Sequence, residues 1–213
     1  MAEASRFVQS LKNPIQWIGA SLILLFVVAV ALAPMVRNIT TPSSRSSVHD
    51  ARTIGLALFS YSIDHNGAYP TGKSSTDVFQ KLIDGGYISD PALLYTRGLK
   101  ISGKVEATSK TLKPENVCFD VTVPVDANSS DLLPVFFLTG YRINYVPGGS
   151  AVPFFLTPEN RPKGIAVCYH GNNAAWLKND GLLDGVVTNF ISQAFDPAGK
   201  KYQQLTPDGP FGP

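Results

Sequence analysis

The sequence predicts an α+β protein in which an N-terminal transmembrane helix precedes an amphipathic helix packed on a small antiparallel β-sheet. Three observations predict this fold class. An uncharged apolar segment lies near the N-terminus, and a helical spacing of apolar residues follows it at 47–64. Short segments rich in β-branched and aromatic residues then fill the chain from about residue 99 to residue 170.

The apolar segment is expected to cross a membrane. Residues 14–36 contain no charged side chain and match the roughly 20 apolar residues that span a hydrocarbon core of about 30 Å. We expect a single-pass helix there, after a cytoplasmic N-terminal segment at 1–13. A cleaved signal peptide is the alternative, because Ala29, Ala31 and Ala33 have the small-x-small spacing that signal peptidase recognises. The leader and the apolar segment both exceed the usual lengths of a signal peptide, which favours the anchor.

A helix is expected after a linker. Residues 37–47 are rich in Ser, Thr and Pro, a composition typical of a linker. Apolar residues then recur at helical spacing over 47–64. We expect Ile54, Leu58 and Tyr61 to face the sheet from this helix.

Turn residues end this helix and delimit a second one. Gly67 tolerates the left-handed conformation that ends helices, and Pro70 cannot continue one. A second short helix is expected in STDVFQKLIDGGYI, with Ser75 or Thr76 as its N-cap and the Gly-Gly pair as its stop.

The rest of the chain has the period of antiparallel strands. Candidate strands are KISGKVEA, NVCFDVTVPV, LLPVFFLTGYRINYV and KGIAVCYHG, separated by Pro, Gly, Asn and Asp. Residues 48–195 are therefore expected to form one domain. The Pro- and Gly-rich residues 196–213 are expected to be an irregular tail.

Composition and cysteine usage narrow the function classes. A net charge of +2 spread along the chain gives no basic patch, so we expect no nucleic-acid partner. Cys118 and Cys168 lie in separate strand-like segments without a CxxC pair or a histidine at ligand spacing, so we expect no metal site. The two cysteines are candidates for a disulfide if the domain lies outside the cytoplasm, and two buried thiols are the alternative.

No motif for catalysis is present in the sequence. His49, His65 and His170 are scattered, and GxSxG, HExxH and phosphate-binding loops are all missing. We therefore expect a protein that is not an enzyme, with no catalytic residues and no cofactor.

The stretch ARTIGLALFSYSIDHNGAYP supplies the most specific pattern in the chain, A-x-x-I-G-L-A-L-x-x-Y-x-x-D-x-x-G-x-x-P. Its members are Ala51, Ile54, Gly55, Leu56, Ala57, Leu58, Tyr61, Asp64, Gly67 and Pro70. The pattern resembles the helix and turn that lead into the globular head of the type IV pilin and type II secretion pseudopilin superfamily, particularly the pseudopilin G-like proteins. This resemblance implies a scaffold function for these residues.

The resemblance also implies a location and partners. It implies a membrane-anchored, non-enzymatic structural or assembly component of a bacterial envelope secretion or pilus-type system. The expected localisation is the bacterial inner membrane, with a pilin-like domain at 48–195 in the periplasm or outside the cell. The expected partners are the membrane and other pilin-like subunits or secretion-system proteins. The alternative is a membrane-tethered binding domain of pilin-like fold that does not polymerise.

The N-terminal part departs from the family pattern. In that family a peptidase cuts after a Gly that precedes a Phe-Thr-Leu-Ile-Glu-like stretch, and the Glu helps to recruit subunits. The nearest equivalent here begins at Gly19, with Ala20 in place of Phe and Leu24 in place of Glu. We therefore expect that the chain is not processed at Gly19.

Overall fold

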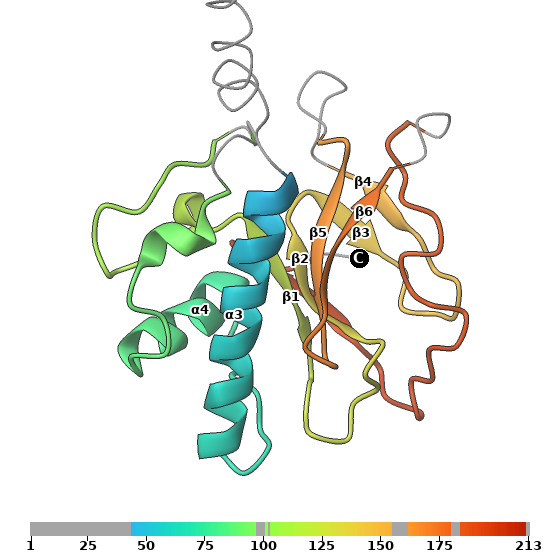
Figure 1. Ribbon diagram of the computed structural model, residues 1–213, viewed down its shortest axis with the longest axis horizontal. Helices are drawn as coiled ribbons and strands as arrows, with labels where there is room; N and C mark the ends of the chain where they lie inside the picture. Colours follow the sequence, from blue (N-terminus) through green and yellow to red (C-terminus); the bar gives the residue numbers. More distant parts are fainter. Residues whose placement is uncertain (1–43, 97–100, 102, 155–161, 180–183, 212–213) are drawn as a thin grey trace, which may run out of the picture. The chain divides into compact units, whose positions relative to one another are not determined.

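Two α-helices and a six-stranded antiparallel sheet organise the part of the chain that the structure describes (Figure 1). The computed structural model describes residues 44–96, 101, 103–154, 162–179 and 184–211. The expected N-terminal segment, the expected transmembrane helix, most of the expected linker and the processing residues Gly19 and Leu24 lie outside these ranges.

Helix α3 (Ser44–Asp64) begins within the expected linker and carries the pilin-like pattern. Ile54 and Leu58 are buried as expected, whereas Tyr61 is only half-buried. The helix ends where the sequence predicts, because Asn66 and Gly67 both have a positive φ, at 55° and 84°. The Gly67 N–H closes the end by donating to the Ser62 carbonyl oxygen at 2.7 Å.

Helix α4 (Ser75–Asp84) confirms the second predicted helix but begins with a different cap. The N-cap is Ser74, whose side chain accepts a hydrogen bond from the Asp77 N–H. The hydroxyls of Ser75 and Thr76, the two expected caps, instead donate to carbonyl oxygens of Phe119 and Pro207, both at 2.8 Å. The sequence spacing predicted the helix correctly. The cap differs because the hydroxyls of Ser75 and Thr76 bond to carbonyl oxygens elsewhere in the domain, and Ser74 caps the helix.

The large sheet is antiparallel throughout. Its strands are β1 (Phe119–Val123), β2 (Pro134–Leu138), β5 (Gly164–Tyr169), β6 (Ala174–Lys178), β7 (Gln203–Thr206) and β8 (Gly209–Pro210), in the spatial order β6-β5-β2-β1-β7-β8. A second sheet pairs β3 (Tyr141–Ile143) with β4 (Ala151–Pro153). Two short 3-10 helices, η1 (Pro91–Leu94) and η2 (Pro114–Asn116), precede β1. No strand forms among the described residues of KISGKVEA.

The expected fold class is wrong in two respects. Instead of one small sheet, the described residues form a six-stranded sheet and a second sheet of two strands, with two α-helices. In the described residues, moreover, no helix is both long and apolar enough to cross a bilayer.

The expected localisation is corrected by the same finding. The bacterial inner-membrane assignment needs a spanning helix, and none of the described helices is one. The segment expected to span the membrane, 14–36, lies outside the described ranges.

The expected irregular tail contributes to the sheet. Strands β7 and β8 lie within residues 196–213, and β7 pairs with β1 through Val121↔Leu205. Composition alone suggested an irregular segment because Pro and Gly are frequent there. Leu205 is buried at 3% exposure, so burial against β1 outweighs the weak local propensity.

Different elements cover the two faces of the large sheet. Helix α3 packs on β5 and β6, and α4 packs on β1 and β7. The opposite face is covered by β3–β4 and by residues 187–195, and Figure 1 shows β3 and β4 on the side away from the two helices. Phe136 contacts Phe79 of α4, whereas the next residue, Phe137, contacts Phe190. This alternation gives each face its own apolar layer.

Candidate functional site

An apolar stripe lies on the exposed side of α3. Its members, Leu56, Phe59 and Ile63, are 49%, 46% and 64% exposed. Because they are three and four residues apart, they lie on one helix face, and we call them the α3 stripe. Single exposed apolar residues are ordinary on protein surfaces. Three on one helix face form a larger apolar surface than a single exposed residue does.

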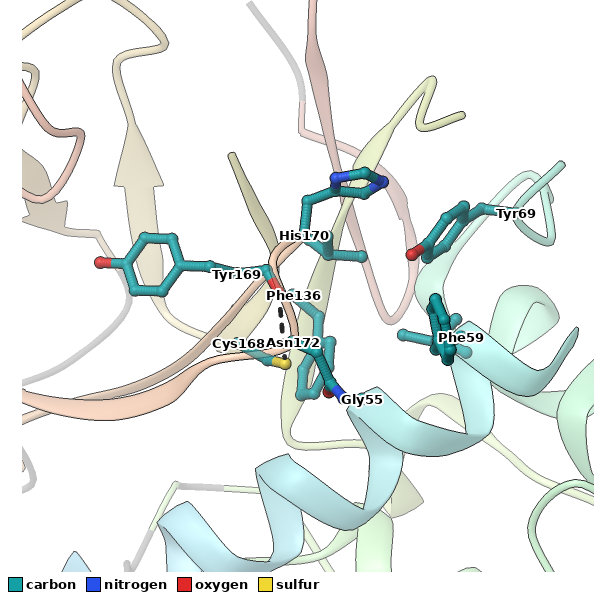
Figure 2. Close-up of a pocket in the computed structure, with 10 residues that line it drawn as sticks. Gly55, Phe59, Tyr69, Phe136, Cys168, Tyr169, His170 and Asn172 are labelled. Atoms are coloured by element: carbon teal, nitrogen blue, oxygen red, sulfur yellow. Dashed lines mark hydrogen bonds between the residues drawn. The ribbon is translucent and has the colours of Figure 1, made fainter. Parts of the chain in front are cut away.

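A shallow pocket opens beside Phe59, with about 210 Å³ of empty space that includes open solvent (Figure 2). Helix α3, the turn that follows it, strand β2 and the end of β5 supply its lining. The lining residues are Gly55, Leu58, Phe59, Tyr69, Val135, Phe136, Cys168, Tyr169, His170 and Asn172. Figure 2 shows Phe59 and Tyr69 on one side of the pocket and His170 on the other.

Gly55 allows the close packing of α3 on β5 next to this pocket. A Cβ atom at Gly55 would lie 2.6 Å from the Cys168 Sγ, which is closer than real Cβ contacts. The turn after β5 also restricts the residue type, because Asn172 adopts a φ of 58°, a left-handed conformation that Asn tolerates. The helix backbone can therefore approach the strand directly, and the pocket stays shallow.

The titratable groups of the pocket are poorly suited to nucleophilic catalysis. Burial raises the pKa of the Cys168 thiol to about 12, and the positive charge of Arg52 offsets this only in part. A nucleophilic cysteine needs the opposite shift, since the thiolate is the reactive form. Burial also raises the pKa of the Tyr69 hydroxyl, although a hydrogen bond with Ser62 opposes the rise.

His170 has an acidic neighbour, Asp131. Its side chain is 10% exposed, and its Nδ1 lies 3.5 Å from the Asp131 Oδ1, so the two form an ion pair when the imidazole is protonated. The Tyr69 ring packs near it, with a centroid distance of 5.5 Å. Within the described ranges, no group of three His, Cys, Asp or Glu side chains could hold a metal ion.

Of the remaining pattern residues, Tyr61 and Asp64 lie at the end of α3, Ala51 lies in its first half and Pro70 follows it. Asp64 accepts a hydrogen bond from the Tyr87 hydroxyl at 2.8 Å, and Tyr61 stacks on His65 at a centroid distance of 3.8 Å. Ala51 and Pro70 are buried. These contacts fix the helix end and the turn, which is a scaffold arrangement.

The two cysteines are free thiols in the structure, and both are buried. The disulfide candidate is therefore not formed. Cys118 follows η2, and Cys168 lies on β5 against α3.

Sequence reasoning missed the α3 stripe as a surface. It counted Leu56 among the pattern residues and left Phe59 and Ile63 without a role. The spacing of three and four residues, on a face different from that of Ile54 and Leu58, was the signal that could have found the stripe.

Comparisons of the chain with protein-family models, with curated proteins and with solved structures found no match.

Proposed function

We propose that the domain is a non-enzymatic assembly component of a bacterial envelope secretion or pilus-type system, which binds other pilin-like subunits or secretion-system proteins. The observation that carries the proposal is the α3 stripe, because it lies on the helix with the pilin-like pattern. Ile54 and Leu58 of that helix pack inward, whereas Leu56 and Ile63 point outward. One helix thus stabilises the domain and presents an apolar surface.

The size of the stripe suits a subunit that makes several contacts. Full burial of a Leu, Ile or Phe side chain contributes about 1.5–3 kcal/mol, and the three stripe residues are already about half covered. Covering them contributes a few kcal/mol, which is too little to hold two protein subunits together on its own. In an assembly, several such contacts on one subunit act together.

A second candidate is a binding domain of pilin-like fold that does not polymerise. The observation that favours it is Leu24, which stands where the related family has the glutamate that recruits subunits. In this case the α3 stripe and the neighbouring pocket would hold a single partner.

Site-specific photo-crosslinking tests the proposal. A photoreactive phenylalanine analogue replaces Phe59 in the full chain, expressed in its native host, and crosslinked proteins are identified by mass spectrometry. We expect pilin-like or secretion-system proteins, and we expect Leu56→Asp with Ile63→Asp to remove the crosslinks. The control position is Val105, which is 53% exposed and lies outside α3.

Three outcomes separate the candidates. Crosslinks from Phe59 to pilin-like subunits in a series of multimers support the assembly component. Crosslinks to one protein in a single product support the binding domain. Crosslinks that are equally frequent from Val105, or that survive the double substitution, would show that the stripe is not the contact surface.

A further inference from the structure

Asp120 is a buried carboxyl group between the two sheets. It lies on β1 with 1% exposure. Its Oδ2 accepts a hydrogen bond of 2.6 Å from the side-chain Nε2 of Gln204, on the neighbouring strand β7. The carboxyl group faces β3–β4, on the side of the sheet away from the helices.

Gln204 connects three strands with one amide group. Its Nε2 also donates to the Tyr141 carbonyl oxygen at 2.6 Å, and its Oε1 accepts from the Ile143 N–H at 3.1 Å. Both of these partners belong to β3. The side chain therefore joins β3 to β7 and to the Asp120 carboxyl group on β1, and its polar atoms are all used.

The surroundings of Asp120 disfavour its charged form. Burial is the largest effect and raises the pKa of Asp120 to about 7, and the negative charge of Asp208 acts in the same direction. Hydrogen bonds from Thr139 and Gln204, and the positive charge of Lys104, act in the opposite direction. Lys104 is itself held by a hydrogen bond to the Pro114 carbonyl oxygen, and burial lowers its pKa.

A tyrosine completes the set of groups near the carboxyl. Tyr145 bonds to the Thr122 hydroxyl at 2.8 Å. Burial and the charge of Asp120 both raise the pKa of Tyr145, so it stays neutral and offers no compensating charge. Lys104 is thus the one cation that acts on Asp120 among the described residues.

We propose that Asp120 and Gln204 form a proton-sensitive latch that holds β3–β4 against the large sheet, closed while Asp120 is neutral and weakened when it loses its proton. In the closed state the acid is held away from water. When β3 leaves the sheet, the acid becomes hydrated and ionises readily. Opening and proton release are therefore coupled.

The sign of the coupling fixes the pH window. The closed-state pKa of about 7 lies above the value of about 4 for a hydrated Asp, so the latch is strongest below pH 4. Its opening constant rises by up to about tenfold per pH unit between about pH 4 and pH 7. Above pH 7 both states are ionised, and the opening constant becomes constant.

Hydrogen exchange of the Ile143 amide in the full chain tests the latch. We expect its protection factor, corrected for intrinsic exchange, to fall about tenfold from pH 5 to pH 6 and about tenfold from pH 6 to pH 8. In Asp120→Asn the protection factor should be independent of pH, because the amide cannot ionise. A flat profile in the wild-type protein, or an equal slope in Asp120→Asn, would overturn the proposal.

A second measurement keeps the test decisive if Asp120→Asn does not fold. The carboxyl carbon of Asp120 in the wild-type protein should titrate with a midpoint near 7, and the amide shift of Ile143 should follow the same midpoint. A midpoint near 4, or an Ile143 shift that ignores it, would show that no such latch exists.

Discussion

The two faces of the large sheet are built by different kinds of contact. The helix face is apolar, and residues close together in the sequence form much of it: Ile54 and Leu58 of α3, and Phe79 of α4. The opposite face holds a polar connection between Asp120 and Gln204, which are 84 residues apart. Local periodicity therefore encodes the first face, whereas only the complete fold assembles the second.

This difference predicts where substitutions act. On the helix face, changes in burial should dominate. On the opposite face, loss of hydrogen-bond partners should dominate. The following substitutions test this comparison, in order of decreasing expected effect.

Leu58→Asp should have the largest effect, because it puts an unpaired charge into the layer between α3 and the sheet. Leu58 is 2% exposed, and we expect a loss of about 3–5 kcal/mol in the free energy of unfolding. Urea unfolding followed by circular dichroism measures it.

The matched control is Leu56→Asp, two residues earlier on the same helix. Leu56 is 49% exposed, so its substitution should cost less than about 1 kcal/mol in the isolated protein. Equal losses for the two variants would show that α3 does not pack on the sheet through Leu58.

Gln204→Met should have the next largest effect and should act on the opposite face. It keeps the side-chain volume but leaves Asp120, the Tyr141 carbonyl oxygen and the Ile143 N–H without their partner. Unsatisfied buried groups cost about 1–3 kcal/mol each when nothing relaxes, and we expect a total loss of about 2–4 kcal/mol. Chemical denaturation at pH 5 measures it.

The interaction between Asp120 and Gln204 supplies the control for this prediction. In an Asp120→Asn background, Gln204→Met should cost measurably less, because one of the three orphaned groups has changed. Additive losses would mean that Asp120 and Gln204 are not energetically coupled, which would contradict the polar connection.

The sequence revealed the helices more completely than the sheets. The 3.6-residue spacing of α3, the stops at Gly67 and Gly86, and the buried positions Ile54 and Leu58 are local properties, and they were predicted. The number of strands was not, because β7 lies in a Pro- and Gly-rich segment that becomes a strand only against β1.

The candidate site was only partly predictable. The pattern identified α3 and Gly55, and the helical spacing also contained the signal that places Phe59 on the face away from Ile54 and Leu58. The Asp120–Gln204 pair was out of reach, because the two residues meet only when β7 pairs with β1. A single Asp within FDVTV is unusual in a buried strand, but its partner on β7 could not be read from the sequence.

Gly55→Ala should have an intermediate effect on the helix face. The added Cβ would meet the Cys168 Sγ at 2.6 Å, and overpacking of this kind costs about 1–3 kcal/mol. The double variant with Cys168→Ala removes the sulfur and should recover most of the loss relative to Cys168→Ala alone. Thermal unfolding of the wild type, the two single variants and the double variant measures the coupling between the two positions. Additive losses would contradict the close approach of α3 to β5.

Ser74→Ala should have the smallest effect, because it removes a helix cap without opening the apolar layer. The Ser74 hydroxyl accepts the Asp77 N–H at 3.1 Å, and the Asp77 carboxylate accepts the N–H of Lys73, the residue before the cap, at 3.0 Å, so both side chains hold the start of α4. We expect a loss of about 1 kcal/mol, and we expect Ser74→Asn, which retains a capping oxygen, to lose less. Ser75→Ala is the informative comparison, because Ser75 is buried and its hydroxyl donates to Phe119 of β1 instead of capping the helix. Hydrogen exchange of the Asp77 amide separates the two roles: Ser74→Ala should accelerate it selectively, whereas Ser75→Ala should lower global stability without that local change. If Ser75→Ala exposed the Asp77 amide and Ser74→Ala did not, the cap would lie one residue later, at the first of the two positions, Ser75 or Thr76, that the sequence pattern offered.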